Sequence, residues 1–246
     1  MRAPTFPADR FPDRVTLCCL AALVLFGLLR LVGASPASFS SLEGTLAGYY
    51  FSFVPTSQAT YLYAPLFAIS TSASFRHSTW CSSVLRRTSR QGAFRDIFGQ
   101  TMAASCLFAV TVTLPSLLAL ATRSGLAAEA LDLAVLGATH FVFDSLFFLV
   151  VGLTYQACWL LTSSAPLSLA LAIVYGGFDS FISAFGGYHG DLWVGWMLTS
   201  YADPSRPLIL LAGLVRILAV VVALLAFCLL LFRRLDFVEG SETRDL

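Results

Sequence analysis

Four ionisable side chains lie inside long apolar stretches of the sequence, where a charge is costly to bury. They are His140, Asp144, Asp179 and Arg216. Inserting such a group at the centre of a membrane helix costs about 2.5–3.5 kcal/mol on insertion scales, so it normally faces the interior of a helix bundle or water. These four residues are therefore the first candidates for a functional or structural polar site.

His140 and Asp144 are spaced i, i+4, which places them on one face of a helix. They could form a hydrogen-bonded pair, a proton relay or two ligands of a metal. A metal site usually needs three or four ligands, and no other His or Cys clearly converges on this pair. We favour the hydrogen-bonded pair and predict no metal site and no catalytic residue.

Asp179 and Arg216 fall at similar depths in the last two apolar stretches, roughly 12–14 Å from their outer ends at 1.5 Å per helical residue. Equal depth on two helices predicts an ion pair. Its role, either a lock between the helices or part of a substrate or gating site, stays open at this point.

The composition indicates an integral membrane protein. Of the 246 residues 57% are apolar and 12% are charged, and the mean hydropathy is +0.79. Soluble domains carry roughly 25% charged residues. A membrane helix needs about 20 mainly apolar residues. We predict an all-α, polytopic single domain over residues 1–246, with six transmembrane helices at about 15–33, 58–75, 99–122, 131–161, 165–187 and 207–232.

The distribution of arginine predicts the orientation of these spans. All fifteen basic residues are Arg, and most fall before the first span, between the second and third, or after the sixth. Basic residues that flank spans remain in the cytoplasm. We therefore expect both termini and the 76–98 loop to be cytoplasmic. Topology accounts for these clusters, so the sequence gives no support to nucleic-acid binding.

The 76–98 loop also carries apolar residues at helical spacing. In each of two sets, the second and third apolar residues follow the first by three to five positions. This spacing predicts an amphipathic helix on the inner membrane surface. Such a helix either anchors the chain to anionic lipid or docks a cytoplasmic partner, and the spacing alone does not separate these. The two sets are Trp80, Val84 and Leu85, and Phe94, Ile97 and Phe98.

Several residues of this loop resemble a known family. Arg86, Arg87, Ser89 and Arg90, followed by Phe94 and a span, are similar to the inner loop of type-2 ABC transporter permeases. The end of the sixth span, Phe232-Arg233-Arg234, resembles that family as well. The resemblance implies that a coupling helix within 76–98 meets an ATPase, with these residues in contact: Trp80, Arg86, Arg87, Arg90, Phe94 and Arg95.

The family further implies a permease subunit of the bacterial inner membrane with no cofactor of its own. ATP and Mg would be bound by a partner ATP-binding cassette subunit, and a second permease subunit would complete the transporter. The chain has no G-x-x-x-x-G-K-[ST] phosphate loop. The implied cargo is an exported peptide, antimicrobial or lipid-like compound. The alternatives are a membrane-embedded enzyme using His140 and Asp144, and a non-catalytic membrane sensor or partner protein.

Local features predict how the spans are shaped. Pro65 and Pro115 are expected to kink the second and third spans. The polar residues at 162–164, followed by Pro166, predict a tight turn and a new helix start. Small residues in span five, including Gly176-Gly177, allow close helix packing within the subunit or against a second one.

Overall fold

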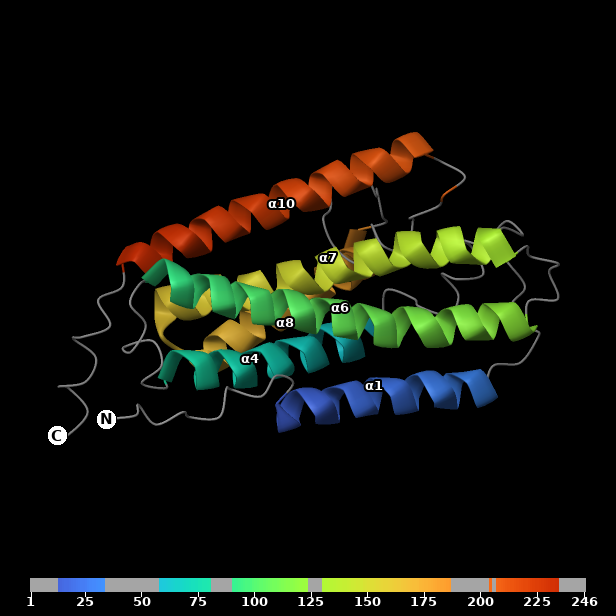
Figure 1. The fold of residues 1–246 in the computed structure, drawn as a ribbon, viewed down its shortest axis with the longest axis horizontal. Helices are drawn as coiled ribbons and strands as arrows, with labels where there is room; N and C mark the ends of the chain where they lie inside the picture. The colour runs from blue at the N-terminus through green and yellow to red at the C-terminus, as the bar shows by residue number, and fades with distance from the viewer. Residues whose placement is uncertain are drawn as a thin grey trace, which may run out of the picture.

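The computed structural model describes residues 13–33, 58–80, 90–123, 130–186, 204 and 207–234, and these residues form helices without any strand (Figure 1). A short π-helix, η2, precedes the second long helix. The remaining helices are α-helical. The elements are α1 (Arg14–Gly33), η2 (Ala59–Tyr63), α4 (Ala64–Trp80), α6 (Arg90–Arg123), α7 (Ala130–Thr162), α8 (Ala165–Gly186) and α10 (Pro207–Arg234).

Each of the six predicted spans coincides with a helix or, for the second span, with η2 and α4. Within the described residues, three helices are long and apolar enough to cross a membrane: Phe94–Ala121, Ala130–Thr162 and Pro207–Arg233. Two shorter apolar helices cover Arg14–Leu29 and Ala165–Phe178. The prediction of an all-helical membrane protein is therefore confirmed in its general form.

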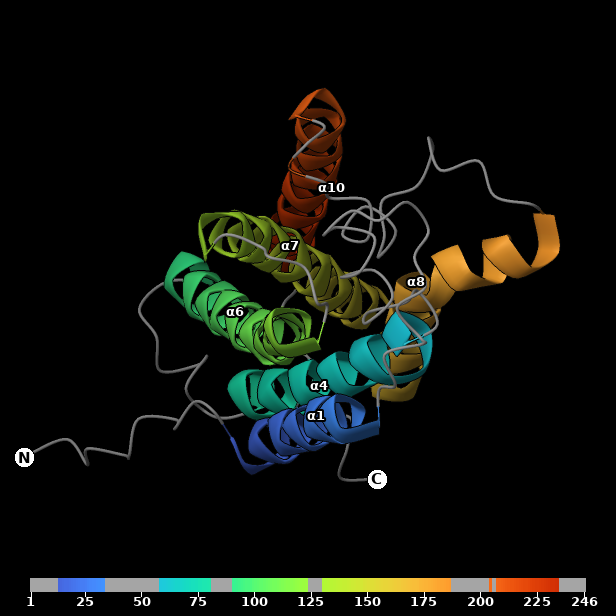
Figure 2. The same ribbon diagram turned by 90° about the vertical axis from the view of Figure 1, so that its right-hand side faces the viewer.

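The helices run in alternating directions along the chain, and α8 is strongly inclined to the long axis that the others follow (Figures 1 and 2). The start of α6 lies at the same end of the bundle as the ends of α4 and α10, whereas α1 begins well short of that end. The connection between α7 and α8 lies at this end as well. Arg95 and Arg233 consequently belong to one end of the molecule, whereas α6 finishes with Arg123 at the other.

Helix α7 is the centre of the bundle. It packs against α4, α6, α8 and α10, with α8 and α10 on different sides of it (Figure 2). Three mutually packed rings join α4, α6 and α7: Phe67 lies 5.0 Å from Phe108 and 5.1 Å from Phe148, centroid to centroid, and Phe108 lies 5.6 Å from Phe148. Aromatic pairs at these separations add to the packing energy of the core.

Pro65 is accommodated by η2. A proline lacks the N–H that would continue the α-helical hydrogen bonds of the preceding turn. The chain responds with a wider turn, in which the Ala64 N–H donates to the Ala59 carbonyl, five residues back. A π-turn is a recognised site of helix bending. Pro115 lies within α6, where it contacts α1: a Cβ added to Gly27 would lie 2.9 Å from Pro115 Cβ.

The predicted tight turn between the fourth and fifth helices is present. The Ser163 N–H donates to the Trp159 carbonyl over 2.8 Å, and Ser163 adopts a φ of 53°. A residue in this left-handed region ends many helices. Helix α8 then begins at Ala165, with Pro166 in its first turn. Gly176 of α8 faces Ala64 directly, so this small residue serves packing within the chain.

The second half of the expected surface helix is part of α6. We predicted that Phe94, Ile97 and Phe98 would lie on a helix along the membrane surface, separate from the third span. Instead α6 is continuous from Arg90, and Phe94 and Ile97 are buried in the bundle. Phe94 packs on Phe232 of α10, with ring centroids 5.7 Å apart. This contact with α10 holds the segment in line with α6.

Candidate functional site

The clearest buried polar site joins the middle of α6 to the middle of α7. His140 and Asp144 lie one turn apart on α7, and both side chains are 0% exposed. The Thr113 hydroxyl of α6 donates a 3.0 Å hydrogen bond to Asp144 Oδ2. Both side chains therefore lie in the bundle interior. The hydrogen bond between His140 and Asp144 stays a prediction, and Thr113 is a partner of Asp144 that the sequence analysis missed.

A second polar link lies further along the same two helices. Gln156 Nε2 of α7 donates to Thr101 Oγ1 of α6 over 2.6 Å, and Thr101 in turn donates to the Ile97 carbonyl. On α6, Thr101 lies twelve residues before Thr113. On α7, Gln156 lies twelve residues after Asp144. Both bonds therefore belong to one antiparallel register, about 18 Å apart along the helix axes at 1.5 Å per residue.

Helix α4 is held by hydroxyl groups. Tyr155 of α7 donates from its hydroxyl to Ser72 Oγ over 3.0 Å, and Ser70 Oγ lies 2.7 Å from Thr16 Oγ1 of α1. On the far side of α7, Cys228 Sγ of α10 lies 3.5 Å from the Leu153 carbonyl oxygen. Polar contacts thus connect α7 to three neighbours, which suits a bundle in which apolar surfaces alone give little specificity between helices.

These links were hard to predict because Ser, Thr and Gln are common in membrane helices. A signal exists in α6, where Thr101, Ser105 and Ser116 recur on one face at helical spacing, and all three are buried. Each of them donates to the carbonyl four residues earlier. The recurrence identifies the buried face but not the partner of each side chain on the neighbouring helix.

The described residues contain no group of three or more His, Cys, Asp or Glu side chains that could hold a metal ion. What the Thr113–Asp144 link can do is fix the register of α6 against α7, because a misaligned pair would leave a buried carboxyl group without its hydroxyl donor.

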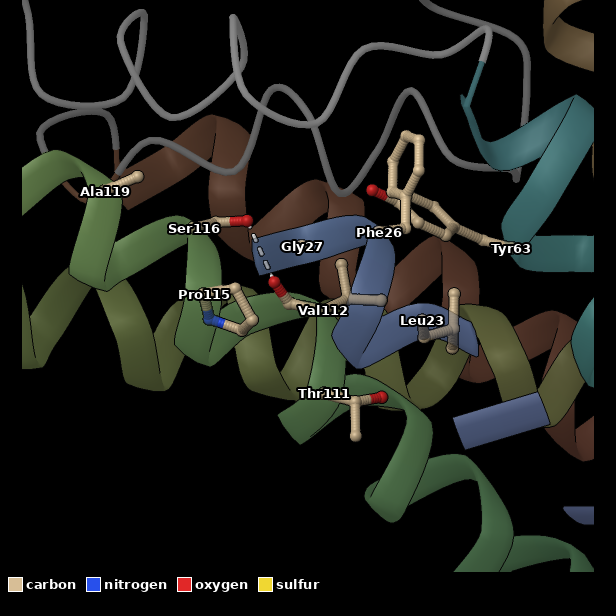
Figure 3. A pocket seen from close by; sticks show the side chains of 9 residues that line it. All are labelled: Leu23, Phe26, Gly27, Tyr63, Thr111, Val112, Pro115, Ser116 and Ala119. Atoms are coloured by element: carbon tan, nitrogen blue, oxygen red, sulfur yellow. Dashed lines mark hydrogen bonds between the residues drawn. The ribbon is translucent and has the colours of Figure 1, made fainter. Parts of the chain in front are cut away.

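A pocket between α1, η2 and α6 is small. Figure 3 shows Phe26, Tyr63 and Pro115 at its wall, and its volume is about 20 Å³. Its hydroxyl group at Ser116 donates to the Val112 carbonyl over 2.8 Å (Figure 3). A space of this size is sufficient for a water molecule.

The structure does not test the predicted ion pair between Asp179 and Arg216. Arg216 lies on an exposed face of α10. Asp179 belongs to α8, and its side chain lies outside the described residues, so the ion pair stays a prediction. Because α8 and α10 pack on different sides of α7, the pair would have to reach around that helix (Figure 2).

The predicted ATPase-coupling residues are distributed over two helix ends and the segment between them. Trp80 ends α4 and Arg90 begins α6, but the side chains of both lie outside the described residues, as do Arg86 and Arg87 entirely. Phe94 is buried and Arg95 is exposed at the start of α6. The two helix ends lie at the same end of the bundle (Figure 1).

Comparison of the chain with models of protein families, with curated proteins and with solved structures finds no match.

Proposed function

We propose that this chain is the permease subunit of an ATP-driven ABC transporter in a bacterial inner membrane. All six helical segments would cross the bilayer, with both termini and the 76–98 segment in the cytoplasm. The observation that carries the proposal is the location of Arg95 and Arg233 near one end of the bundle, where α6 begins and α10 ends (Figure 1). The positive-inside tendency assigns that end to the cytoplasm.

The start of α6 supports a contact with an ATPase. Helix α6 has 34 residues, a length of about 51 Å at 1.5 Å per residue, whereas the hydrocarbon core is about 30 Å thick. At least one end of α6 would therefore extend beyond that core. Arg95 and Asp96 are exposed near its start, where a soluble subunit could reach them from the cytoplasm.

The same segment is mechanically connected to the rest of the bundle. Phe94 packs on Phe232 near the end of α10, and Gln156 of α7 bonds to Thr101 a few turns further along α6. A displacement of the α6 start would thus reach α10 and α7 through packed contacts. Rigid-body movement of this kind is a common mode of switching between two conformations.

In this proposal the chain binds neither ATP nor Mg itself, and a partner ATP-binding cassette subunit supplies both. A second permease subunit, identical or different, completes the membrane part. The cargo class proposed is an exported peptide, antimicrobial or lipid-like amphipathic compound. The two pockets of about 20 and 10 Å³ among the described residues are too small for such a cargo.

The test is co-purification from native membranes. An affinity-tagged chain should retain an ATP-binding cassette subunit, identified by mass spectrometry. Reversing charge at the proposed contact, with Arg86→Glu, Arg90→Glu and Arg95→Glu together, should release the ATPase while the chain remains folded. The matched control is Arg123→Glu at the opposite end of α6, which should keep it. Retention of the ATPase in the triple variant would reject the coupling role.

The buried His140 and Asp144 pair is the one observation that favours the membrane-enzyme alternative. In the permease reading it has a structural role. ATP-driven transport that persists in His140→Ala with Asp144→Asn would exclude chemistry at this pair. Loss of transport in a folded variant that still retains its ATPase would instead give the pair a functional role in the transport cycle.

A further inference from the structure

A small polar pocket lies between α4 and α6, apart from the Asp144 site. Its volume is about 10 Å³. That is close to the volume that one water molecule needs, about 10–15 Å³. Its lining combines hydroxyl and amide groups with three apolar side chains: Thr71, Ser74, Phe75, Ile97, Gln100, Thr101 and Ala104.

Thr71 lines this pocket with a buried hydroxyl group. Its side chain is 4% exposed, and its Oγ1 has no hydrogen-bond partner within the described part of the chain. Other buried hydroxyls in the bundle behave differently: those of Thr101 and Ser105 donate to the carbonyl four residues earlier in their own helix. A buried hydroxyl without a partner is destabilising. We therefore expect the Thr71 hydroxyl to form a hydrogen bond with a group that occupies the pocket.

The opposite wall offers polar groups to the same guest. Thr101 Oγ1 accepts from Gln156 and donates to the Ile97 carbonyl, which leaves one further lone pair on the oxygen. Gln100 and Ser74 line the same space from α6 and α4. Buried waters typically make two to four hydrogen bonds, and this lining supplies polar side chains from two helices.

We propose that an ordered water molecule occupies this pocket and bridges the Thr71 hydroxyl of α4 to the polar wall of α6. A water fits better than a metal cation, because no carboxylate lines the pocket and hard cations bind six or more oxygen ligands. Thr71 lies nine residues before the end of α4, about 14 Å at 1.5 Å per residue, so the water is a deep one. The site does not depend on the transport proposal.

Radiolytic hydroxyl labelling of the full chain in detergent tests this site, because bound water generates radicals beside buried side chains. Phe75 lines the pocket and is 3% exposed, whereas Phe67 is 0% exposed and packs among Phe108 and Phe148. We expect Phe75 to be oxidised well above Phe67. Thr71→Val, which keeps the shape and removes the hydroxyl, should lower Phe75 labelling to the Phe67 level.

Thr71→Ser keeps the hydroxyl and should preserve the labelling of Phe75. Two results would overturn the proposal: equal labelling of Phe75 and Phe67 in the unmodified chain, or unchanged Phe75 labelling in Thr71→Val. A third result would also overturn it and would assign the pocket to a hydrated cation. In that case the labelling of Phe75 would fall when sodium is exchanged for choline and return when sodium is restored.

Discussion

The Thr113 hydroxyl donates a 3.0 Å hydrogen bond to Asp144 Oδ2, and this bond ties the middle of α6 to the middle of α7. Replacing Thr113 by Val removes the donor and keeps the shape, so Asp144 loses its partner on α6. We expect the free energy of unfolding in detergent to fall by about 1–2 kcal/mol. Denaturant unfolding of the purified chain measures it.

Thr111 provides the control for this change. It lies on the same helix, and its hydroxyl donates to the Phe108 carbonyl of its own backbone. Thr111→Val should change the free energy of unfolding by less than about 0.5 kcal/mol, as surface or self-satisfied positions do. If the two variants are equally stable, the Thr113–Asp144 bond does not hold α6 against α7.

The Gln156–Thr101 bond should show coupling between the two residues. A double-mutant cycle with Gln156→Leu and Thr101→Val isolates the pair from the separate effects of each change. We expect a coupling energy of about 0.6–1.7 kcal/mol, the range found for hydrogen bonds between membrane helices. Additive effects within error would mean that the 2.6 Å contact contributes no stability.

The helices were predictable from the sequence because their apolar runs are long. The turn at 162–166 was also predictable, since its polar residues and Pro166 mark a helix start locally. The extension of α6 back to Arg90 was not, because Phe94 and Ile97 have the same spacing on a surface helix and on a packed one. Only the contact with Phe232 of α10 distinguishes the two.

The polar site was predictable only in part. His140 and Asp144 stand out because ionisable residues are rare in apolar runs. Thr113, Thr101 and Gln156 do not stand out, and their partners depend on the register of α6 against α7. That register is set by packing between helices distant in sequence, including the close approach of Gly152 to α6.

Gly152 should tolerate no side chain. A Cβ at this position would lie 2.7 Å from Thr101 Cγ2, closer than packed carbon atoms allow, and 3.2 Å from Phe67 Cε1, which is tighter than an ordinary contact. Gly152→Ala should therefore push α7 away from α4 and α6 and destabilise the protein by about 1–3 kcal/mol. The midpoint of thermal unfolding in detergent measures the effect.

Gly99 is the matched control for Gly152. It also lies inside a helix, but nothing lies within 4 Å of a Cβ added there. Gly99→Ala should leave the protein as stable or stabilise it by up to about 1 kcal/mol, the helix preference of Ala over Gly. A Gly152→Ala protein as stable as Gly99→Ala would contradict the close packing of α7.

The proposed topology predicts which exposed positions share a side of the membrane. Single cysteines introduced at Arg95 and Ser163, on a background without native cysteines, should react with a membrane-impermeant maleimide only from the cytoplasm. Both positions are exposed at the end of the bundle where α6 begins and α7 ends. Leu131, exposed at the start of α7, is the control and should react only from outside.

Labelling of Arg95→Cys and Leu131→Cys from the same side would mean that α6 and the start of α7 do not form an antiparallel membrane crossing. Labelling of Arg95→Cys from outside, with Leu131→Cys inside, would invert the orientation, and the ATPase contact at the start of α6 would be excluded with it.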